Sequence, residues 1–166
     1  LILAPIIIPS IAVVLGIHSV FISIGLTNTI FGVILVHLIP TVPYMTLVMS
    51  AIFSNFDADF EYQARSLGAS SLKAFYYITL PAILPGVVIG GLFAFLVSWS
   101  QYILTLVIGG GKILTLPLLL FSFATSGRND ITGAIGIIYI LPGIIILIFT
   151  TKYLSRRNVI GVFERI

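Results

Sequence analysis

Polar side chains that could do chemistry lie inside long apolar stretches of this sequence. His37, Thr41 and Tyr44 are spaced i, i+4 and i+7, so one face of a helix carries all three. A second cluster, Ser98–Tyr102, brings hydroxyls, an amide and two aromatic rings into another apolar stretch. Such groups line solute pathways in membrane proteins, but a His bonded to a neighbouring helix can equally serve packing, and both roles stay open here. The pathway candidates are His37, Thr41, Tyr44, Ser98, Trp99, Gln101 and Tyr102.

The sequence does not suggest an enzyme. It has no Cys, and its two His residues, His18 and His37, lie far apart with no acidic partner inside the apolar stretches. A metal site or a nucleophile with its base needs such groups together, so we predict no catalytic residue, metal ligand or cofactor in this chain. A phosphate-binding loop is also missing, because Gly111-Lys112 is followed by Ile113 and Leu106 occupies the place of the first glycine.

The composition is that of a membrane protein. Of 166 residues, 59% are hydrophobic and 8% are charged, against about 45–50% and about 25% in a soluble domain. The lipid bilayer is the expected solvent, and basic residues in short clusters between apolar runs argue against nucleic acid as a partner. A bilayer core of about 30 Å takes about 20 apolar residues in a helix. We therefore predict an all-α fold, a polytopic transmembrane helical bundle. Its expected spans are Leu1–Ser23, Thr29–Phe53, Ala82–Ile108 and Ile131–Tyr153.

Basic residues predict how these spans are oriented. Those expected on one side are Arg65, Lys73, Lys152, Arg156, Arg157 and Arg165, and those on the other are Lys112 and Arg128. The positive-inside rule then places the loop between the second and third spans and the C-terminal end in the cytoplasm. The chain opens at Leu1 inside an apolar run, so we expect it to be the C-terminal part of a longer protein, with residues 1–166 in a single domain.

Two further patterns concern helix packing and helix ends. Gly86 and Gly90 form a small-xxx-small pair, which lets helices pack closely, within the chain or across a dimer. Asn129 and Asp130 precede the last span, where we expect them to cap the helix rather than to bind a ligand.

The loop between the second and third spans, residues 55–81, is the central loop of this protein. Asp57 can cap a first short helix, and Gly68 can take the left-handed conformation that ends it. Ser70 or Ser71 can cap a second short helix, after which Pro81 leads into the third span. We therefore predict two short helices at an angle. The carboxylates of the loop fall in its first turn, where they suit the helix dipole without any catalytic role.

The central loop resembles the cytoplasmic signature of type I ABC importer permeases, the inner-membrane components of binding-protein-dependent transport systems. That motif runs E-A-A, three residues, G, nine residues, I, one residue, L-P. Counting nine residues from Gly68 reaches Ile78, and Leu80-Pro81 completes the pattern. The opening triplet departs from the family, because Tyr62 stands where the family has Glu and Glu61 lies one residue earlier. One residue on a helix is a rotation of about 100°, so the family's charged contact does not carry over directly.

The resemblance implies that the central loop couples this chain to a cytoplasmic ATPase subunit, whose groove holds the two short helices. ATP and Mg²⁺ would bind that partner, and the implied location is the bacterial inner membrane. Further implied partners are a second permease subunit, identical or different, and an extracytoplasmic solute-binding protein. The implied coupling residues are Glu61, Ala64, Gly68, Ala69, Ser70, Leu72, Ile78, Leu80 and Pro81.

The transported solute follows less directly from the sequence. The sequence from Tyr102 to Pro117 resembles that of permeases for polyamines, ferric iron, thiamine and similar small solutes. No carboxylate lies deep in any expected span, which argues against a polycation. The alternative to an importer subunit is an ATP-independent channel or secondary transporter, and the same missing carboxylate argues against its ion-coupled form.

Overall fold

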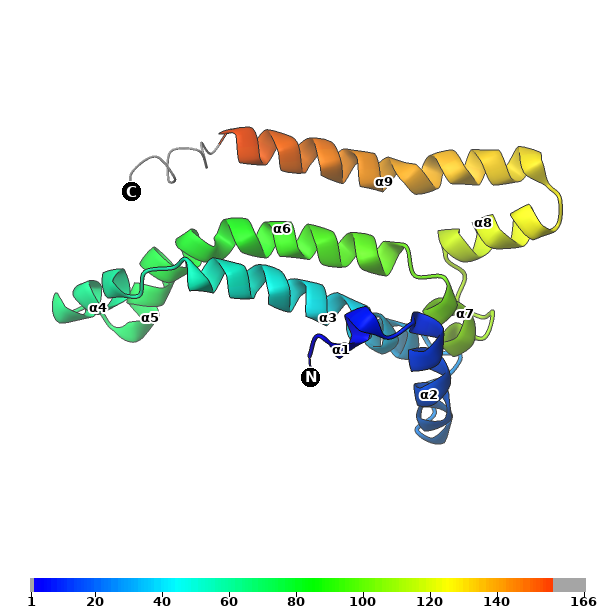
Figure 1. Ribbon diagram of the computed structural model, residues 1–166, viewed down its shortest axis with the longest axis horizontal. Coiled ribbons are helices and arrows are strands. Elements are labelled where there is room, and N and C mark those ends of the chain that lie inside the picture. Colours follow the sequence, from blue (N-terminus) through cyan, green and yellow to red (C-terminus); the bar gives the residue numbers. More distant parts are fainter. Residues whose placement is uncertain (1, 157–166) are drawn as a thin grey trace.

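The computed structural model describes residues 2–156, and the regular structure in this range is helical. The all-α prediction is therefore confirmed. Three long helices, α3, α6 and α9, run side by side, with α4 and α5 at one end and α7 and α8 at the other (Figure 1). The helices are α1 (Ala4–Ile7), α2 (Ser10–Ser23), α3 (Ile30–Ser54), α4 (Asp59–Ser66), α5 (Ser71–Ala74), α6 (Leu80–Trp99), α7 (Ile103–Gly109), α8 (Leu116–Thr125) and α9 (Asn129–Arg156).

Three helical segments in the described range are long and apolar enough to cross a membrane: Ile30–Ser54, Ser71–Trp99 and Asn129–Lys152. The C-terminal ends of α3 and α9 lie at the same end of the molecule as α4 (Figure 1). This arrangement agrees with the orientation predicted from the basic residues. Arg157 and Arg165, which also entered that prediction, lie outside the described residues.

The first expected span, Leu1–Ser23, is wrong as a single helix. Proline disfavours helical backbone in the residue before it, and Ile8 is extended (ψ 129°) ahead of Pro9. The remaining helix, α2, has 14 residues and a length of about 21 Å, which is short of the bilayer core. In Figure 1 it lies at an angle to the long helices, beside α7, instead of running along them.

The third expected span, Ala82–Ile108, is wrong at both ends. Its helix already starts at Ser71, because the π-helical turn Phe75–Thr79 joins α5 to α6 without a break. It stops at Trp99, where the Ser100 hydroxyl donates to the carbonyl of Val97. Serine side chains compete in this way with helical hydrogen bonds, so the polar cluster ends the helix and α7 follows as a separate element.

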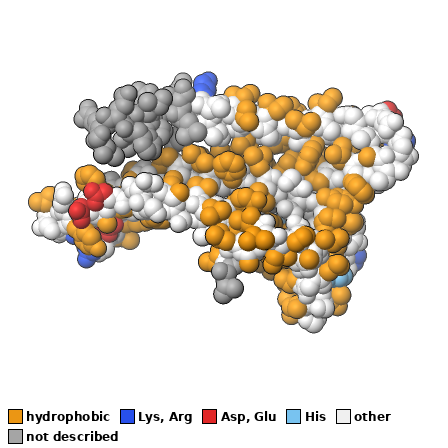
Figure 2. Space-filling view, viewed as in Figure 1, with side chains coloured by type: hydrophobic (Ala, Val, Ile, Leu, Met, Phe, Trp, Pro, Cys, Tyr) orange, Lys and Arg blue, Asp and Glu red, His pale blue; other side chains and the backbone are white. Residues whose placement is uncertain are grey.

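A small apolar core lies at the α7 end of the molecule. It joins α2, α3 and α7 through the buried side chains Val14, Phe21, Val33, Val36, Leu104 and Ile108. The turn before α3 is fixed to this core, since the Asn28 amide donates to the carbonyl of Ile108 at 2.7 Å. Elsewhere on the long helices large apolar side chains are exposed, and they cover much of the surface in Figure 2. Such a surface suits lipid rather than water.

Helices α3 and α6 pack closely through two glycines. A Cβ on Gly86 would collide with the side chain of Ile52, and one on Gly90 would lie 2.6 Å from Sδ of Met45 and 3.3 Å from Cγ1 of Val48. Both contacts are with α3 of the same chain. The small-xxx-small pair therefore serves packing within the chain.

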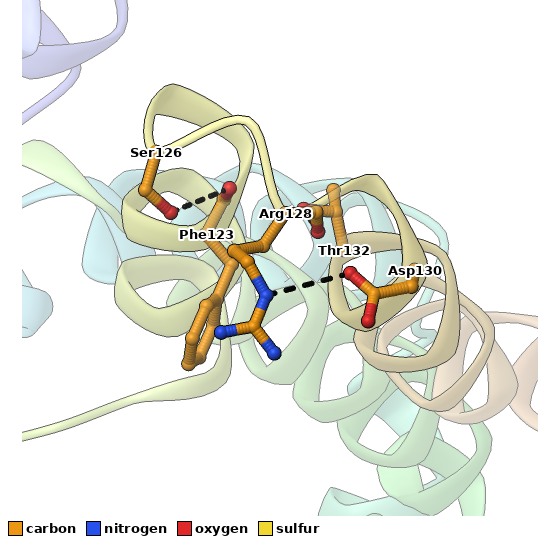
Figure 3. Close-up of polar contacts among 5 residues, drawn as sticks. All are labelled: Phe123, Ser126, Arg128, Asp130 and Thr132. Atoms are coloured by element: carbon orange, nitrogen blue, oxygen red, sulfur yellow. Dashed lines mark hydrogen bonds and ion pairs between the residues drawn. The ribbon is translucent and has the colours of Figure 1, made fainter.

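The turn between α8 and α9 is closed by local contacts (Figure 3). The Ser126 hydroxyl donates to the carbonyl of Phe123, and Arg128 forms an exposed ion pair with Asp130 at 3.6 Å. The expectation that Asn129 and Asp130 cap α9 needs correction, because both are helical residues of its first turn. An acidic side chain in that turn still suits the helix dipole.

Substitutions of two adjacent glycines on α6 test how closely this helix packs on α3. Gly90→Leu should lower the free energy of unfolding by about 1–3 kcal/mol, because the new side chain must displace Met45 and Val48. Gly91→Leu is the matched control, since nothing lies within 4 Å of its Cβ position. Thermal unfolding of both variants in detergent measures the difference. Equal midpoints for the two variants would contradict this packing.

Candidate functional site

Gly68 closes the first helix of the central loop. Its φ is +92°, in the left-handed region, as predicted from the sequence. The Ala69 amide donates to the carbonyl of Ala64 and the Gly68 amide to that of Arg65, both at 3.0 Å. This pair of bonds is a Schellman motif, which satisfies the last carbonyls of α4 and reverses the chain.

Side chains cap both helices of the central loop. Ser70 accepts a hydrogen bond from the Lys73 amide, as predicted, at 3.4 Å. Asp57 accepts from the Asp59 amide at 2.9 Å, but it stands one residue before the cap position, which Ala58 occupies. The loop thus begins and reverses as its sequence indicates.

The second helix of the loop is not a separate element, contrary to our prediction. The chain from Ser71 to Trp99 is continuous, and the Leu80 amide donates to the carbonyl of Phe75, five residues back. Pro81 has no amide hydrogen and its ring would clash with a carbonyl four residues earlier in a regular helix. A π-helical turn widens the helix locally and removes that clash. The loop is therefore joined directly to a membrane-spanning helix.

One side-chain hydrogen bond connects α4 to this continuous helix within residues 2–156. The Thr79 hydroxyl donates to Oε2 of Glu61 at 2.9 Å, and Thr79 is only 6% exposed. A carboxylate acceptor makes such a bond stronger than one between neutral groups. Glu61 thus faces the body of the protein.

The outer surface of the central loop is apolar and exposed. Leu67, next to the turn, is 90% exposed, and Phe60, Tyr62 and Leu72 are exposed as well. Acidic and basic side chains are grouped around this end of the molecule (Figure 2). Of the predicted coupling residues, Gly68, Ser70, Leu72 and Pro81 are exposed, whereas Glu61, Ala64, Ala69, Ile78 and Leu80 are half-buried. Most of the exposed set surrounds the Gly68 turn.

His37 joins three helical elements at the break between α6 and α7. Its Nδ1 lies 2.9 Å from Oγ of Ser98 and its Nε2 lies 2.8 Å from Oγ1 of Thr105. The Thr105 hydroxyl donates to the carbonyl of Gln101, so it accepts from Nε2–H of His37. In that neutral tautomer Nδ1 accepts from the Ser98 hydroxyl. Both imidazole nitrogens and both hydroxyl protons then take part in hydrogen bonds.

A pocket of about 270 Å³ lies beside this histidine. It brings together four of the predicted pathway residues, His37, Ser98, Trp99 and Gln101. Phe95, Thr115, Leu116 and Pro117 complete the wall. Oγ1 of Thr115 is buried and has no hydrogen-bond partner among the described residues, which leaves it available to a ligand group or a water. Thr105 and Thr115 were missed from the sequence, since a hydroxyl in an apolar run gives no periodic signal.

The other pathway candidates do not join this pocket. Thr41 is buried, and its hydroxyl donates to the carbonyl of His37 in its own helix. Tyr44 is exposed on α3, and Tyr102 packs on Phe121 with ring centroids 4.5 Å apart. Trp99 has a second role, because its Nε1–H donates to the carbonyl of Tyr139 and so holds α9 against α6.

The arrangement suits transport better than catalysis. Among residues 2–156, no group of three or more His, Cys, Asp or Glu residues could hold a metal ion. The structure instead combines membrane-spanning helices, a pocket lined mainly by apolar surface at a helix break, and a protruding loop. This combination fits a membrane permease.

Residues 1–159 match the family described as binding-protein-dependent transport system inner membrane component. The chain belongs to this family of inner-membrane ABC permeases, which transport solutes and are not enzymes. The resemblance predicted from the central loop is therefore confirmed.

The relatives that this chain matches are named for different solutes. The chain is 30% identical over 165 residues to the putrescine transport system permease protein PotI of Escherichia coli (strain K12), covering 95% of this chain and 58% of PotI. It is 26% identical over 150 residues to the spermidine/putrescine permease PotC of Haemophilus influenzae, covering 90% and 58%. It is also 30% identical over 155 residues to the trehalose permease SugB of Mycobacterium tuberculosis, covering 92% and 56%. The chain thus spans somewhat more than half the length of these relatives.

Removal of one hydroxyl tests the histidine bridge. Thr105→Val should lower the free energy of unfolding by about 1 kcal/mol, because it leaves Nε2–H of His37 without its acceptor. Thr46→Val is the control, since that hydroxyl only bonds the carbonyl of Val42 in its own helix. Chemical unfolding in mixed micelles measures both. Equal losses in the two variants would show that the bridge adds no stability.

Proposed function

We propose that this chain forms part of the solute pathway of an ATP-binding cassette importer and couples solute uptake to ATP hydrolysis on a separate cytoplasmic subunit. The partners in this proposal are two ATPase subunits, a second permease subunit and an extracytoplasmic binding protein. The central loop and the C-terminal end face the cytoplasm, in agreement with the basic residues on that side. ATP and Mg²⁺ belong to the ATPase.

The observation that carries the proposal is the continuity between the central loop and a membrane span. Gly68 fixes the reversal after α4, and the helix that follows runs from Ser71 to Trp99 without interruption. A helix transmits displacement along its axis because each turn is hydrogen-bonded to the next. A movement of the ATPase against the exposed residues around Leu67 is therefore passed to α6.

The far end of that helix reaches the pocket beside His37. Trp99 and Gln101 lie at the break that ends α6, and His37 ties the break to α3. A displacement of α6 along its axis changes the size of this pocket. We therefore place the solute pathway at the pocket beside His37.

The solute in this proposal is a small polar molecule of the polyamine, iron or thiamine kind. Two of the relatives described above are named for putrescine or spermidine. The pocket is lined mainly by apolar surface, with the rings of Phe95 and Trp99 in its wall and Gln101 and Thr115 beside them. It contains no carboxylate, so a cationic group would be held by the aromatic faces.

Substitution of Gly68 tests the coupling. Valine strongly disfavours the left-handed backbone, so Gly68→Val strains the turn by about 1–3 kcal/mol. ATP-dependent uptake of putrescine into proteoliposomes that contain the full-length complex should fall by about tenfold or more. Gly68→Asn is the matched variant, because asparagine tolerates this conformation, and it should keep most of the uptake.

The amount of permease in the membrane and the ATPase that co-purifies with it are the controls. Nothing lies within 4 Å of the Cβ position of Gly68, so the strain in the valine variant is confined to the backbone. Normal uptake by Gly68→Val would remove the central loop from the coupling mechanism. Putrescine flux without ATP and without a co-purifying ATPase would favour a channel or secondary transporter.

A further inference from the structure

Glu61 and Tyr62 are adjacent on α4 but face different surroundings. Tyr62 is exposed, whereas Oε2 of Glu61 accepts the Thr79 hydroxyl at 2.9 Å. Successive residues on a helix are about 100° apart, so the two side chains point in different directions. The carboxylate is bonded to its own chain, and an aromatic ring takes the outward place.

The π-helical turn brings Thr79 to this position. Each π turn adds one residue to a helix, which rotates the residues before it relative to those after it. Thr79 is the last residue of that turn and is almost fully buried, with its hydroxyl on the side of α4. The hydrogen bond therefore joins α4 to the residues where the central loop continues into the membrane-spanning helix.

Asp59, a second acidic residue at the start of α4, differs from Glu61. Asp59 lies in the same first turn of α4 as Glu61, but it is exposed. Both carboxylates suit the positive end of the helix dipole. The dipole therefore does not distinguish them, whereas the bond to Thr79 does.

We propose that Glu61 is a positioning residue, which holds α4 on the helix of α6 through Thr79 and does not bind the ATPase with its charge. This inference rests on the proposed function, since it names how that coupling element keeps its shape. The ATPase contact then falls to the exposed apolar side chains Tyr62, Leu67 and Leu72. What matters at position 61 is an acceptor atom facing Thr79, not a negative charge facing outward.

The experiment uses the full-length permease in nanodiscs and its ATPase as the probe. Glu61→Ala and Thr79→Val should each weaken ATPase binding by about fivefold, because each removes the same hydrogen bond. The double variant should be no weaker than either single one, as expected for two partners in one interaction. Glu61→Gln and Thr79→Ser keep an acceptor and a donor, and both should bind within about twofold of the parent. Asp59→Ala is the control for lost charge and should also bind like the parent.

Amide hydrogen exchange of the permease alone gives a second readout that needs no ATPase. Exchange in α4 should rise by about fivefold in Glu61→Ala and in Thr79→Val and stay near the parent value in the two conservative variants. A charge contact with the ATPase predicts the opposite pattern, in which Glu61→Gln binds as weakly as Glu61→Ala while Thr79→Val is unaffected. That result would overturn the inference and leave the proposed function intact. A parent permease that binds no ATPase would overturn the proposed function as well.

Discussion

The continuity of the helix from Ser71 to Trp99 is the constraint on which the rest of the structure depends. Lipid offers no partner for backbone groups, so a segment that crosses the bilayer must remain helical. At about 1.5 Å per residue this helix is longer than the bilayer core, and its first turns therefore extend beyond it. The π-helical turn Phe75–Thr79 keeps the helix continuous ahead of Pro81. In our proposal this continuity makes the central loop and α6 one mechanical unit.

Both ends of the unit are defined by polar contacts. At the loop end Glu61 and Thr79 join α4 to the helix, and at the other end His37 bridges the break through Ser98 and Thr105. Polar groups inside a membrane protein are costly unless they are paired, so these contacts select one arrangement of the helices. In our proposal His37 has both a packing role and a pathway role, because the same side chain supports the break and borders the pocket.

Local chemistry was predictable from the sequence and long-range contacts were not. The left-handed Gly68 was predicted, and the Ser70 cap was one of the two predicted alternatives, Ser70 or Ser71. The continuous helix past Pro81 was missed, since a proline equally suits a helix start and a π-helical turn, and the bond to Thr79 comes from a residue 18 positions away. The end of α6 at Trp99 was missed because no glycine or proline marks it, and the break at Pro9 because a proline inside a membrane helix is often tolerated.

The most direct test of rigid coupling is the distance between α4 and the middle of α6 in the working complex. The 166 residues contain no Cys, so spin labels on Gln63→Cys and Gly91→Cys are specific within this chain, and both sites are exposed. Pulsed electron spin resonance on the full complex, resting and trapped with ATP, should give the same narrow distance distribution, which broadens in Thr79→Val. A distance that changes with nucleotide in the parent would show that the loop and α6 move independently, and would contradict the account.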